Sequence, residues 1–370
     1  MRIGVPTEIK VLERRVGLTP ESVREAVAHG HDVLVQSGAG LGIGADDARY
    51  ESAGAKILAD AAAVFAEADM IVKVKEPQAV ERAMLRPGQL LFTYLHLAPD
   101  PEQTHDLLAS GATCIAYETV TDHEGGLPLL APMSKVAGRM SVQAGAHALE
   151  SPQGGAGLLL GGVPGVAPAK VVVIGGGVVG VNATEMAVGM GADVTVLERN
   201  VDVLDDLDAR FGTAIRAVYS NRSSLEQYVV DADLVIGAVL VKGARAPHLV
   251  SAEMITAMRA GSVVVDVAID QGGCFETSKA TTHADPTYVV DDVVHYCVAN
   301  MPGAVAQTSA YALNNSTLPY VLELADRGHA AVLASNPHMR NGLNITDGQL
   351  TEAAVAEALE LPHVDPATLF

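Results

Sequence analysis

The 370-residue sequence predicts an α/β fold made of two doubly wound parallel-sheet domains with an interdomain cleft between them. Three observations carry this prediction. Short β-branched runs alternate with Ala/Leu/Glu-rich stretches along most of the chain, which is typical of strand–helix–strand units. A glycine-rich turn joins a buried strand to a helix near the middle of the chain. The length exceeds that of one ordinary hydrophobic core and favours about two domains.

The first half of the chain supplies one alternating series. We expect strands at residues 2–5, 32–36, 70–75, 90–94 and 114–117. We expect helices at residues 20–29, 59–67, 78–84 and 101–110. The start of the first helix is marked by Thr19 as a capping residue, Pro20 at the first helical position and Glu21 in the first turn.

A glycine-rich passage at 154–165 precedes a second alternating series, with strands expected at residues 170–174, 193–197, 234–238, 262–267 and 295–298. After Pro302 no strand pattern is visible. We expect a long helix at 303–325, interrupted near Pro319, and a terminal helix at 346–361. These C-terminal helices are expected to return to the first domain. The predicted domains are therefore a substrate and catalytic domain, residues 1–128 plus 307–370, and a dinucleotide-binding domain, residues 129–306.

Composition and charge exclude several classes of protein. Apolar residues make up 49% of the chain and charged residues 18%, which excludes intrinsic disorder, and the 36 glycines follow no collagen period. The formal net charge of −20 opposes the phosphates of nucleic acids and anionic lipids, so neither nucleic acid nor membrane is an expected partner. Cys114, Cys274 and Cys297 show no CxxC spacing. They predict reduced thiols, and neither a disulfide framework nor a cysteine zinc site.

We expect neither a targeting segment nor a membrane segment in this sequence. Its start lacks the apolar stretch of a signal peptide. The most apolar region, residues 157–181, is broken by Pro164, Pro168 and Lys170, so it lacks the roughly 20 continuous apolar residues that span a bilayer. We therefore expect a soluble, cytoplasmic protein.

Residues 170–180 combine a buried strand with the pattern G-x-G-x-x-G. A helix at 181–190 and a second strand are expected to follow, as in Rossmann-like domains. Gly175 would allow the tight turn, Gly177 would let the backbone approach a pyrophosphate, and Gly180 would allow close packing of helix and strand. The first turn of the helix then offers free N–H groups to phosphates.

Glu198 closes the second strand of this unit. It is placed to accept hydrogen bonds from the ribose hydroxyls and to repel a 2′-phosphate, which favours NAD over NADP. Arg199 leaves an alternative open, because an arginine after the acid can hold a 2′-phosphate. The alternative for the whole motif is a purely structural glycine-rich turn that binds no ligand.

Polar residues at predicted strand ends are the candidates for chemistry, because α/β proteins bind ligands there. Arg15 follows the first strand, and Lys75, His96 and Asp270 end or follow later ones. Arginine binds a carboxylate with paired hydrogen bonds, lysine polarises a carbonyl or imine, histidine moves protons near neutrality, and a carboxylate orients water. Together they indicate a site for a small α-amino or α-keto acid. Taken singly, each residue also has an explanation without function. Arg15 could be a surface charge, Lys75 part of a salt bridge, His96 an inert histidine and Asp270 a turn former.

Several long motifs give the chain its resemblance to one family. They are GVPTE (4–8), RVGLTP (15–20), KVKEP (73–77), YLHLA (94–98), APMS (131–134), AGR (137–139), GGVPGV (161–166), the glycine turn, IDQGG (269–273) and ANMP (299–302). Across essentially its whole length the chain resembles the family of L-alanine dehydrogenases and proton-translocating transhydrogenase α subunits.

This resemblance implies reversible oxidative deamination of L-alanine to pyruvate and ammonium with NAD. It implies that Arg15 and Lys75 bind the substrate and that His96 and Asp270 are the catalytic groups. It also implies a set of residues near the cofactor: Met133, Ser134, Gly175, Gly177, Val178, Val179, Gly180, Glu198, Ser220, Val239, Leu240, Val267, Ala268, Ile269, Lys279, Val298, Asn300 and Met301.

The resemblance further implies a homohexamer built through the cofactor domains. A magnesium site of some relatives would use Glu323 with a histidine at position 327, where this chain has Arg327, so no metal is expected. Two alternatives are a transhydrogenase α-type subunit and a nucleotide-sensing protein without catalysis. The pair of Lys75 and His96 argues against the first, which catalyses no deamination, and the intact set of Arg15, Lys75, His96 and Asp270 argues against the second.

Overall fold

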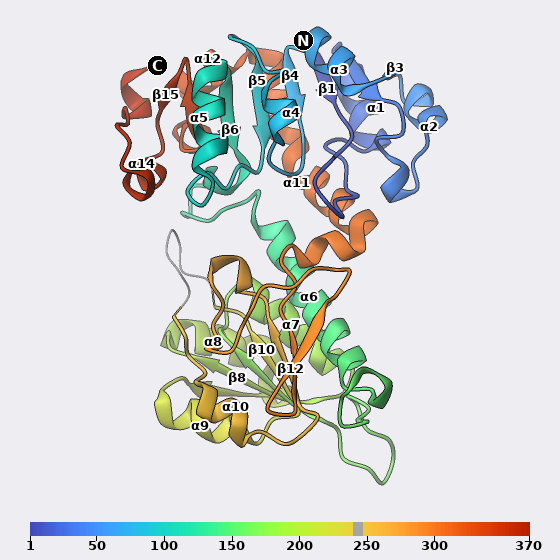
Figure 1. Cartoon of the computed structure of the whole chain (residues 1–370), viewed down its shortest axis with the longest axis vertical. Helices are drawn as coiled ribbons and strands as arrows, with labels where there is room; N and C mark the ends of the chain where they lie inside the picture. Colours follow the sequence, from blue (N-terminus) through green and yellow to red (C-terminus); the bar gives the residue numbers. More distant parts are fainter. Residues whose placement is uncertain (240–246) are drawn as a thin grey trace. The chain divides into compact units, whose positions relative to one another are not determined.

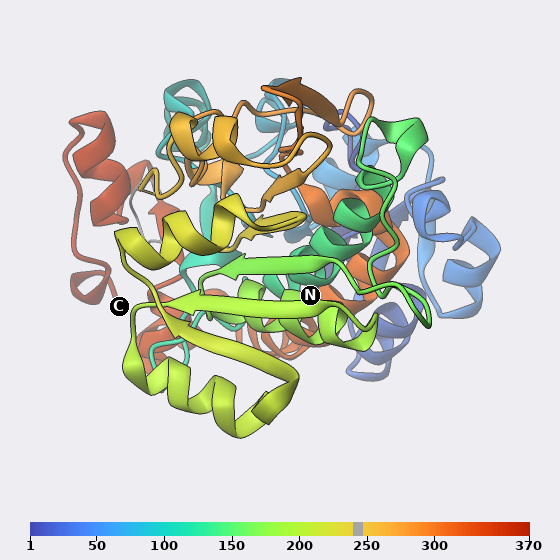
Figure 2. The same cartoon turned by 90° about the horizontal axis from the view of Figure 1, so that it is seen from below.

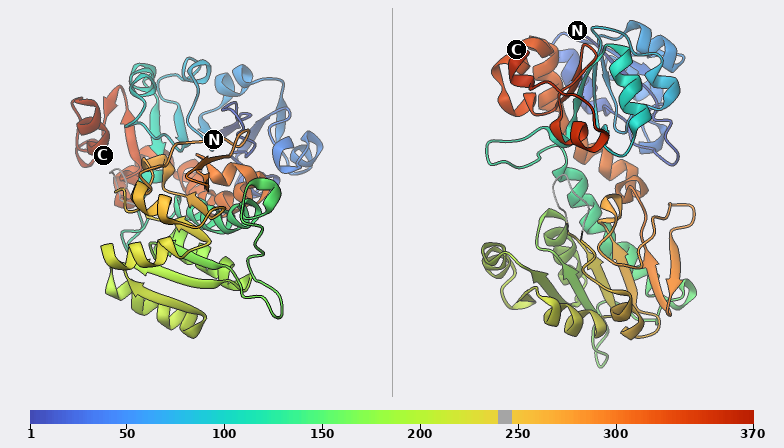
Figure 3. Two further views of the ribbon diagram at one scale, coloured as in Figure 1. Left: turned by 60° about the horizontal axis from the view of Figure 1, so that its bottom comes forward. Right: turned by 60° about the vertical axis from the view of Figure 1, so that its left-hand side comes forward.

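The computed structural model describes residues 1–239 and 247–370 (Figure 1). The chain divides into two compact units. Unit 1 comprises Met1–Met133 and Val305–Phe370, and unit 2 comprises Ser134–Ala304. In each unit helices flank a mainly parallel sheet (Figures 2 and 3). The prediction of an α/β fold with two such sheets is confirmed.

Unit 1 contains β1 (Arg2–Val5), β2 (Asp32–Gln36), β3 (Lys56–Leu58), β4 (Met70–Val72), β5 (Leu90–Thr93), β6 (Thr113–Ala116), β14 (Leu343–Thr346) and β15 (Gln349–Leu350). They form one eight-stranded sheet in the order β15-β14-β6-β5-β4-β1-β2-β3. The strands from β6 to β3 run parallel, whereas β14 pairs antiparallel with both β6 and β15.

The helices of unit 1 are α1 (Pro20–Ala28), η1 (Leu41–Ile43), α2 (Asp47–Ser52), α3 (Ala61–Glu67), α4 (Ala79–Arg82), α5 (Pro101–Ser110), η2 (Tyr117–Thr119), α11 (Ala306–Arg327), α12 (His329–Ser335), α13 (Pro337–Arg340), α14 (Ala353–Leu359) and η7 (Pro366–Thr368). The predicted start of α1 is confirmed, because the Thr19 hydroxyl accepts a hydrogen bond from the N–H of Ser22. Phe65 of α3 and Leu107 of α5 are buried in one core with Ile71 and Leu91 of the sheet. Burial of these apolar side chains fixes both helices on the sheet.

Unit 2 contains β7 (Lys170–Ile174), β8 (Asp193–Glu198), β9 (Ile215–Tyr219), β10 (Leu234–Gly237), β11 (Val263–Asp266), β12 (Thr287–Val290) and β13 (Val293–Tyr296). Their order is β12-β13-β11-β10-β7-β8-β9, and β12 is antiparallel to β13. The helices are α7 (Val178–Gly189), α8 (Val201–Phe211), η3 (Ser151–Gln153), η4 (Gly212–Ala214), α9 (Arg222–Val230), α10 (Ala252–Ala257), η5 (Ile269–Gln271) and η6 (Met301–Val305). The long helix α6 (Ala131–Ala148) begins in unit 1 and continues into unit 2.

The side chains of β7 show why the sheet of unit 2 is covered on both faces. Val171 and Val173 lie in one core cluster with residues of α6 and α7. Val172 and Ile174 lie in a second cluster with residues of α9 and α10. Because successive residues of a strand point to opposite faces, an uninterrupted apolar run needs helices on both sides. The sequence KVVVI therefore directly encodes a central strand.

The prediction for the C-terminal region is wrong in part. Residues 343–350 form the hairpin β14–β15, and the terminal helix is limited to α14. The turn between the two strands is Asp347-Gly348, with φ of 49° and 75°. An Asp-Gly pair with positive φ is a preferred two-residue hairpin turn, and it is the signal that would have indicated the hairpin.

The long helix expected at 303–325 is observed as α11 after the short helix η6, and it continues through Pro319 without a break. Proline removes one backbone hydrogen bond there. Val321 and Leu324 after the proline are buried, as is Leu313 before it, so packing on both sides holds the helix together. None of the helices described is both long and apolar enough to cross a bilayer.

Candidate active site

Arg15, Lys75 and His96 follow three adjacent strands of unit 1. Arg15 comes after β1, Lys75 after β4 and His96 after β5, and these strands lie side by side in the order β5-β4-β1. Because the strands are parallel, their carboxyl ends share one edge of the sheet, which is where α/β proteins bind ligands. The structure therefore brings these three predicted residues to the same edge.

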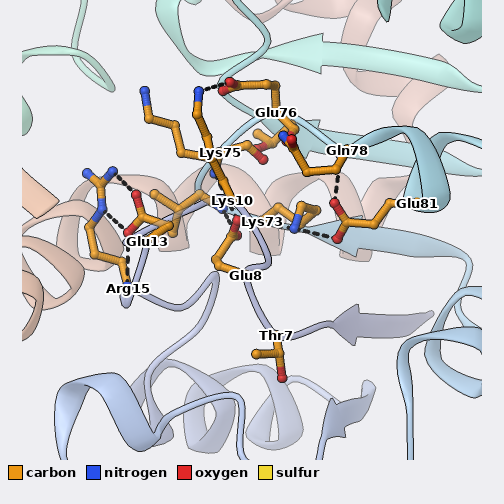
Figure 4. Close-up of polar contacts among 12 residues, drawn as sticks. Thr7, Glu8, Lys10, Glu13, Arg15, Lys73, Lys75, Glu76, Gln78 and Glu81 are labelled. Carbon is orange, nitrogen blue, oxygen red and sulfur yellow. Dashed lines mark hydrogen bonds and ion pairs between the residues drawn. The ribbon is translucent and has the colours of Figure 1, made fainter. Parts of the chain in front are cut away.

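Arg15 is held by a bidentate pair with Glu13. The Arg15 Nε and Nη2 atoms donate to the Glu13 carboxylate at 2.7 and 2.5 Å, and the Arg15 backbone N–H adds a bond of 3.0 Å (Figure 4). Both side chains are buried. Burial acts to lower the pKa of Arg15, but the Glu13 carboxylate outweighs it and raises that pKa. The guanidinium thus keeps its charge, and its Nη1 atom donates to the Met133 Sδ atom at 3.0 Å.

Lys75 lies just beyond the end of β4, whereas the sequence placed it inside the strand. Its backbone is fixed on two sides: the Thr93 hydroxyl donates to the Lys75 carbonyl at 3.1 Å, and the Lys75 N–H donates to the Glu8 carboxylate at 3.4 Å. The neighbouring Glu76 forms an ion pair with Lys10. Burial acts to raise the pKa of Glu76, but the attraction of Lys75 and Lys10 outweighs it and lowers that pKa. Two lysines, Lys10 and Lys75, therefore act on the Glu76 carboxylate.

His96 is partly exposed and sits in a strained turn. Its φ is +50°, in the left-handed region that non-glycine residues seldom adopt. The Glu118 carboxylate holds this turn by accepting hydrogen bonds from the N–H groups of Leu95 at 3.0 Å and His96 at 2.6 Å. The His96 Nδ1 atom lies 3.9 Å from the Glu118 Oε1 atom. An outward-facing imidazole beside a carboxylate is suited to proton transfer.

Tyr94 is a buried support of this site that the sequence did not indicate as functional. Its ring stacks on that of His96, and its hydroxyl donates to the carbonyl of Leu129 at 2.5 Å. Burial raises the pKa of Tyr94, so the hydroxyl stays protonated and remains a donor. The only sequence signal for this role is that Tyr94 stands two residues before His96.

A cavity of about 330 Å³ adjoins this edge of unit 1. Its lining combines charged side chains with small residues: Thr7, Glu8, Glu13, Arg14, Arg15, Gly38, Ala39, Leu41 and Gly42. The volume is at the lower end of the range of small-molecule sites. Arg15 forms part of its wall.

The glycine turn of unit 2 has the geometry that the sequence predicted. Gly175 has φ of +101°, and a Cβ on Gly180 would lie 1.8 Å from the Gly175 carbonyl oxygen. A Cβ on Gly177 would meet no described atom within 4 Å. The helix α7 begins directly after Gly177, which gives no side-chain cap to its first N–H groups. Open space in front of uncapped N–H groups is what a pyrophosphate needs, so these residues fit a dinucleotide.

Glu198 lies at the end of β8 beside this turn. Its Oε2 atom accepts from the Gly176 N–H at 2.7 Å, and its Oε1 atom accepts from the N–H groups of Arg199 and Asn200 at 2.6 and 2.8 Å. The carboxylate therefore also braces the glycine turn, a role that spacing alone did not indicate. Arg199 itself is exposed.

Most of the other predicted cofactor residues in unit 2 lie at carboxyl ends of parallel strands. Val178 and Val179 open α7, and Ser134 lies in α6 after Met133 of unit 1. Ser220 follows β9, Val239 follows β10, and Val298 follows β13; after β11 come Val267, Ala268 and Ile269. Asn300 has φ of +63°, Met301 is buried, and the Lys279 N–H donates to the Tyr288 hydroxyl at 2.7 Å. Leu240 lies outside the described residues.

Asp270 is exposed in η5, in the loop after β11 of unit 2. The buried Asp266 anchors both ends of this loop by accepting from the N–H groups of Ala268 at 3.0 Å and Cys274 at 2.9 Å, and from the Ser278 hydroxyl at 2.6 Å. Sequence reasoning placed Asp266 only within a strand. Its burial at a strand end is a property of the folded sheet.

Arg327, which the sequence analysis singled out as replacing an expected histidine, is paired within unit 1. Its Nη1 atom donates to the Glu323 carboxylate at 2.7 Å, and its Nη2 atom donates to the Ser335 hydroxyl at 2.6 Å. Within residues 1–239 and 247–370, no group of three or more His, Cys, Asp or Glu side chains is arranged to hold a metal ion.

The chain matches two family models, one in each half of the sequence. Residues 4–137 match the family "Alanine dehydrogenase/PNT, N-terminal domain", and residues 141–353 match "Alanine dehydrogenase/PNT, C-terminal domain". The chain belongs to the alanine dehydrogenase/PNT family. The two matches together cover most of the sequence and include Arg15, Lys75, His96, the glycine turn and Asp270.

Individual members of the alanine dehydrogenase/PNT family align over the full chain. An alanine dehydrogenase of Halomonas elongata is 62% identical over 369 residues, with complete coverage of both chains. That of Mycobacterium tuberculosis is 54% identical over 369 residues, again with complete coverage. A solved L-alanine dehydrogenase superposes with a TM-score of 0.95 at 52% identity, covering 97% of this chain and 99% of that one. A transhydrogenase from Sinorhizobium meliloti, at 24% identity and a TM-score of 0.81 over 96% of this chain and all of the other, shares the fold.

Proposed function

We propose that this chain is an NAD-dependent L-alanine dehydrogenase, which converts L-alanine, water and NAD reversibly to pyruvate, ammonium, NADH and a proton. The observation that carries the proposal is the placement of Arg15, Lys75 and His96 after three adjacent parallel strands, in a chain that keeps an open glycine turn for a dinucleotide. Relatives named alanine dehydrogenase, identical at 54 to 62% of positions over the full chain, support it.

In this mechanism the cationic residues bind and orient the substrate. The buried Arg15 and the nearby Lys75 hold the substrate carboxylate and, in the reverse direction, the carbonyl oxygen of pyruvate. The bound NAD supplies the hydride acceptor. Holding the reacting carbon in one orientation lowers the entropic part of the barrier, which is worth up to about 7–11 kcal/mol when alignment is very good.

The proton transfers belong to His96 and Asp270. Hydride loss from the Cα atom leaves an imine, to which water adds while His96 or Asp270 accepts a proton. The same proton is returned to the amino group of the resulting carbinolamine. The C–N bond then breaks as the carbinolamine hydroxyl gives its proton to the same base and becomes the carbonyl of pyruvate, and the released ammonia takes up a proton to become ammonium. The exposed side chain of His96 and the carboxylate of Glu118 next to it suit an imidazole that gains and loses a proton in each cycle.

Glu198 supports the choice of NAD as the cofactor. Its three N–H contacts hold the carboxylate next to the glycine turn, where the ribose of a dinucleotide lies in this kind of fold. A carboxylate there accepts hydrogen bonds from ribose hydroxyls and repels a 2′-phosphate.

We also propose a cytoplasmic homohexamer whose residues 1–128 and 307–370 bind the substrate and whose residues 129–306 bind NAD. The exposed apolar side chains of Leu159, Val163, Val166 and Met190 support an assembly that uses unit 2, because they are 44 to 66% exposed in the single chain.

The test is NADH formation, followed at its absorbance band, with L-alanine, L-serine, glycine or no amino acid. We expect rapid NADH formation with L-alanine that depends on NAD. Pyruvate with ammonium should drive the reverse reaction. Dinucleotide binding without any amino-acid-dependent NADH formation would contradict the proposal and favour a transhydrogenase-type or sensory role.

A further inference from the structure

A buried cluster of charged side chains is centred on Lys73, two residues before Lys75, and the mechanism above does not use it. The Lys73 Nζ atom donates to the Glu8 carboxylate at 3.1 Å and to the Glu81 carboxylate at 2.7 Å (Figure 4). All three side chains are buried. Burial acts to lower the pKa of Lys73, but the attraction of Glu8 and Glu81 outweighs it and raises that pKa. We call these residues the Glu8–Lys73–Glu81 cluster.

The two carboxylates of the cluster have different second roles. The Glu8 Oε1 atom accepts from the Val74 N–H at 2.6 Å, and its Oε2 atom accepts from the Lys75 N–H at 3.4 Å. The Glu81 Oε2 atom accepts from the Gln78 N–H at 2.8 Å, at the start of α4. Glu8 therefore contacts the backbone of the predicted substrate residue, whereas Glu81 caps a helix.

Glu8 belongs to the same chain segment as Arg15. Both Glu8 and Arg15 lie between β1 and α1, in a segment that runs close against β4. The close approach depends on Gly17, since a Cβ there would lie 2.2 Å from the Val72 carbonyl oxygen. A single segment therefore presents Arg15 and, through Glu8, holds the backbone that carries Lys75.

We propose that Glu8 is a positioning residue for the substrate site, which acts by fixing the backbone of Val74 and Lys75 beside the segment that carries Arg15. The proposal rests on the proposed function, because it takes Lys75 to bind the substrate. Because Lys75 is proposed to bind the substrate and not to carry protons, a shift of its backbone is expected first to weaken substrate binding.

The test compares Glu8→Gln with Glu81→Gln. Each variant removes one negative charge from the cluster and keeps the side-chain size. In Glu8→Gln one oxygen remains an acceptor, while the new amino group cannot accept from Lys73 and Lys75. We expect the KM for pyruvate and for L-alanine to rise by roughly tenfold or more, as for loss of a charge-assisted hydrogen bond. The kcat should change less, and the Kd of NADH should stay as in the unchanged protein.

In Glu81→Gln the KM values should stay close to those of the unchanged protein, even where the melting temperature falls equally. The proposal would be overturned if KM rose equally in Glu8→Gln and Glu81→Gln, since a merely structural role of the cluster affects both variants alike. It would also be overturned if KM changed in neither variant. Should Glu8→Gln fail to fold, Glu8→Asp takes its place: it keeps the charge but is one methylene too short to reach the backbone, and the same rise in KM is expected.

A second measurement works without substrate. Amide hydrogen exchange should speed up over residues 72–76 in Glu8→Gln and over residues 78–82 in Glu81→Gln. Unchanged exchange over 72–76 in Glu8→Gln would also overturn the proposal. If the unchanged protein forms no NADH from alanine, the proposed function fails, while this exchange comparison still decides whether Glu8 holds the Lys75 segment.

Discussion

The imidazole of His96 lies parallel to the ring of Tyr94, with the ring centroids 5.8 Å apart and the planes inclined by 9°. Tyr94 is anchored through its hydroxyl to the Leu129 carbonyl and packs edge-on against Tyr117 at 5.1 Å. A buried aromatic pair thus sets the orientation of an exposed histidine. This arrangement keeps the imidazole accessible while it limits the rotation of its ring.

His96→Ala should lower kcat by about 10²- to 10⁴-fold, because general acid–base catalysis contributes that much. The Kd of NADH, measured by fluorescence, should stay near that of the unchanged protein, since His96 belongs to unit 1 and the glycine turn to unit 2. His105→Ala is the control, as His105 is an exposed histidine in α5. Normal turnover in His96→Ala would remove His96 from the catalytic role.

Gly177→Ala and Gly180→Ala should fail in different ways. In Gly180→Ala the new Cβ would overlap the Gly175 carbonyl oxygen at 1.8 Å, so we expect a loss of about 1–3 kcal/mol of stability, seen in urea unfolding. In Gly177→Ala the Cβ meets open space at φ of −71°, so stability should be kept. NADH binding should nevertheless weaken in Gly177→Ala, because the methyl group occupies the path of the pyrophosphate. Equal NADH affinity in Gly177→Ala and the unchanged protein would show that no phosphate approaches there.

Glu198→Gln should shift the cofactor preference toward NADP. The amide keeps the size of the side chain and removes the charge that repels a 2′-phosphate, and the exposed Arg199 remains to pair with it. We expect the ratio of kcat/KM for NADP to that for NAD to rise by about tenfold or more, which is about 1.4 kcal/mol. Glu198→Ala should shift the ratio too and also lower the melting temperature, since it removes the acceptor for Gly176. A constant ratio in both variants would mean that Glu198 does not read the ribose.

The buried His295 should make the protein less stable in mild acid. Its Nδ1 atom donates to the Val293 carbonyl at 2.9 Å, and its Nε2 atom accepts from the Thr277 hydroxyl at 2.8 Å, which fits the neutral ring. Burial lowers the pKa of His295. Below the ordinary value of about 6.5 the unfolded chain therefore binds a proton that the folded chain does not, so stability falls as the pH drops from there toward the folded pKa.

Urea midpoints at pH 7.5, 6.5 and 5.5 measure this effect. We expect the midpoint of the unchanged protein to fall over this range and that of His295→Gln to fall less, from a lower starting value. Burial also lowers the pKa of His329, but this histidine is present in both proteins and cancels in the comparison. Identical pH dependence in the two proteins would contradict the prediction.

Local sequence alone determined much of this protein. The runs that became β1, β2 and β7 had their observed bounds, because strongly apolar β-branched segments form strands almost wherever they lie. The helix start at Thr19-Pro20 and the glycine turn after β7 were also predictable, because their conformations depend on a few adjacent residues. Arg15, Lys75 and His96 were identifiable as polar residues that follow predicted strands, and parallel strands place such residues along one edge of a sheet.

Tertiary structure alone decided the rest. The β14–β15 hairpin extends the sheet by pairing with β6, more than 200 residues earlier in the chain, and only the free energy of burial selects such a partner. Lys73 and Asp266 both lie in apolar runs of the sequence. No local signal shows that Lys73 pairs with Glu8 and Glu81, or that Asp266 anchors a loop. A buried charge is stabilised by partners that folding brings to it, so its role is set by contacts distant in sequence.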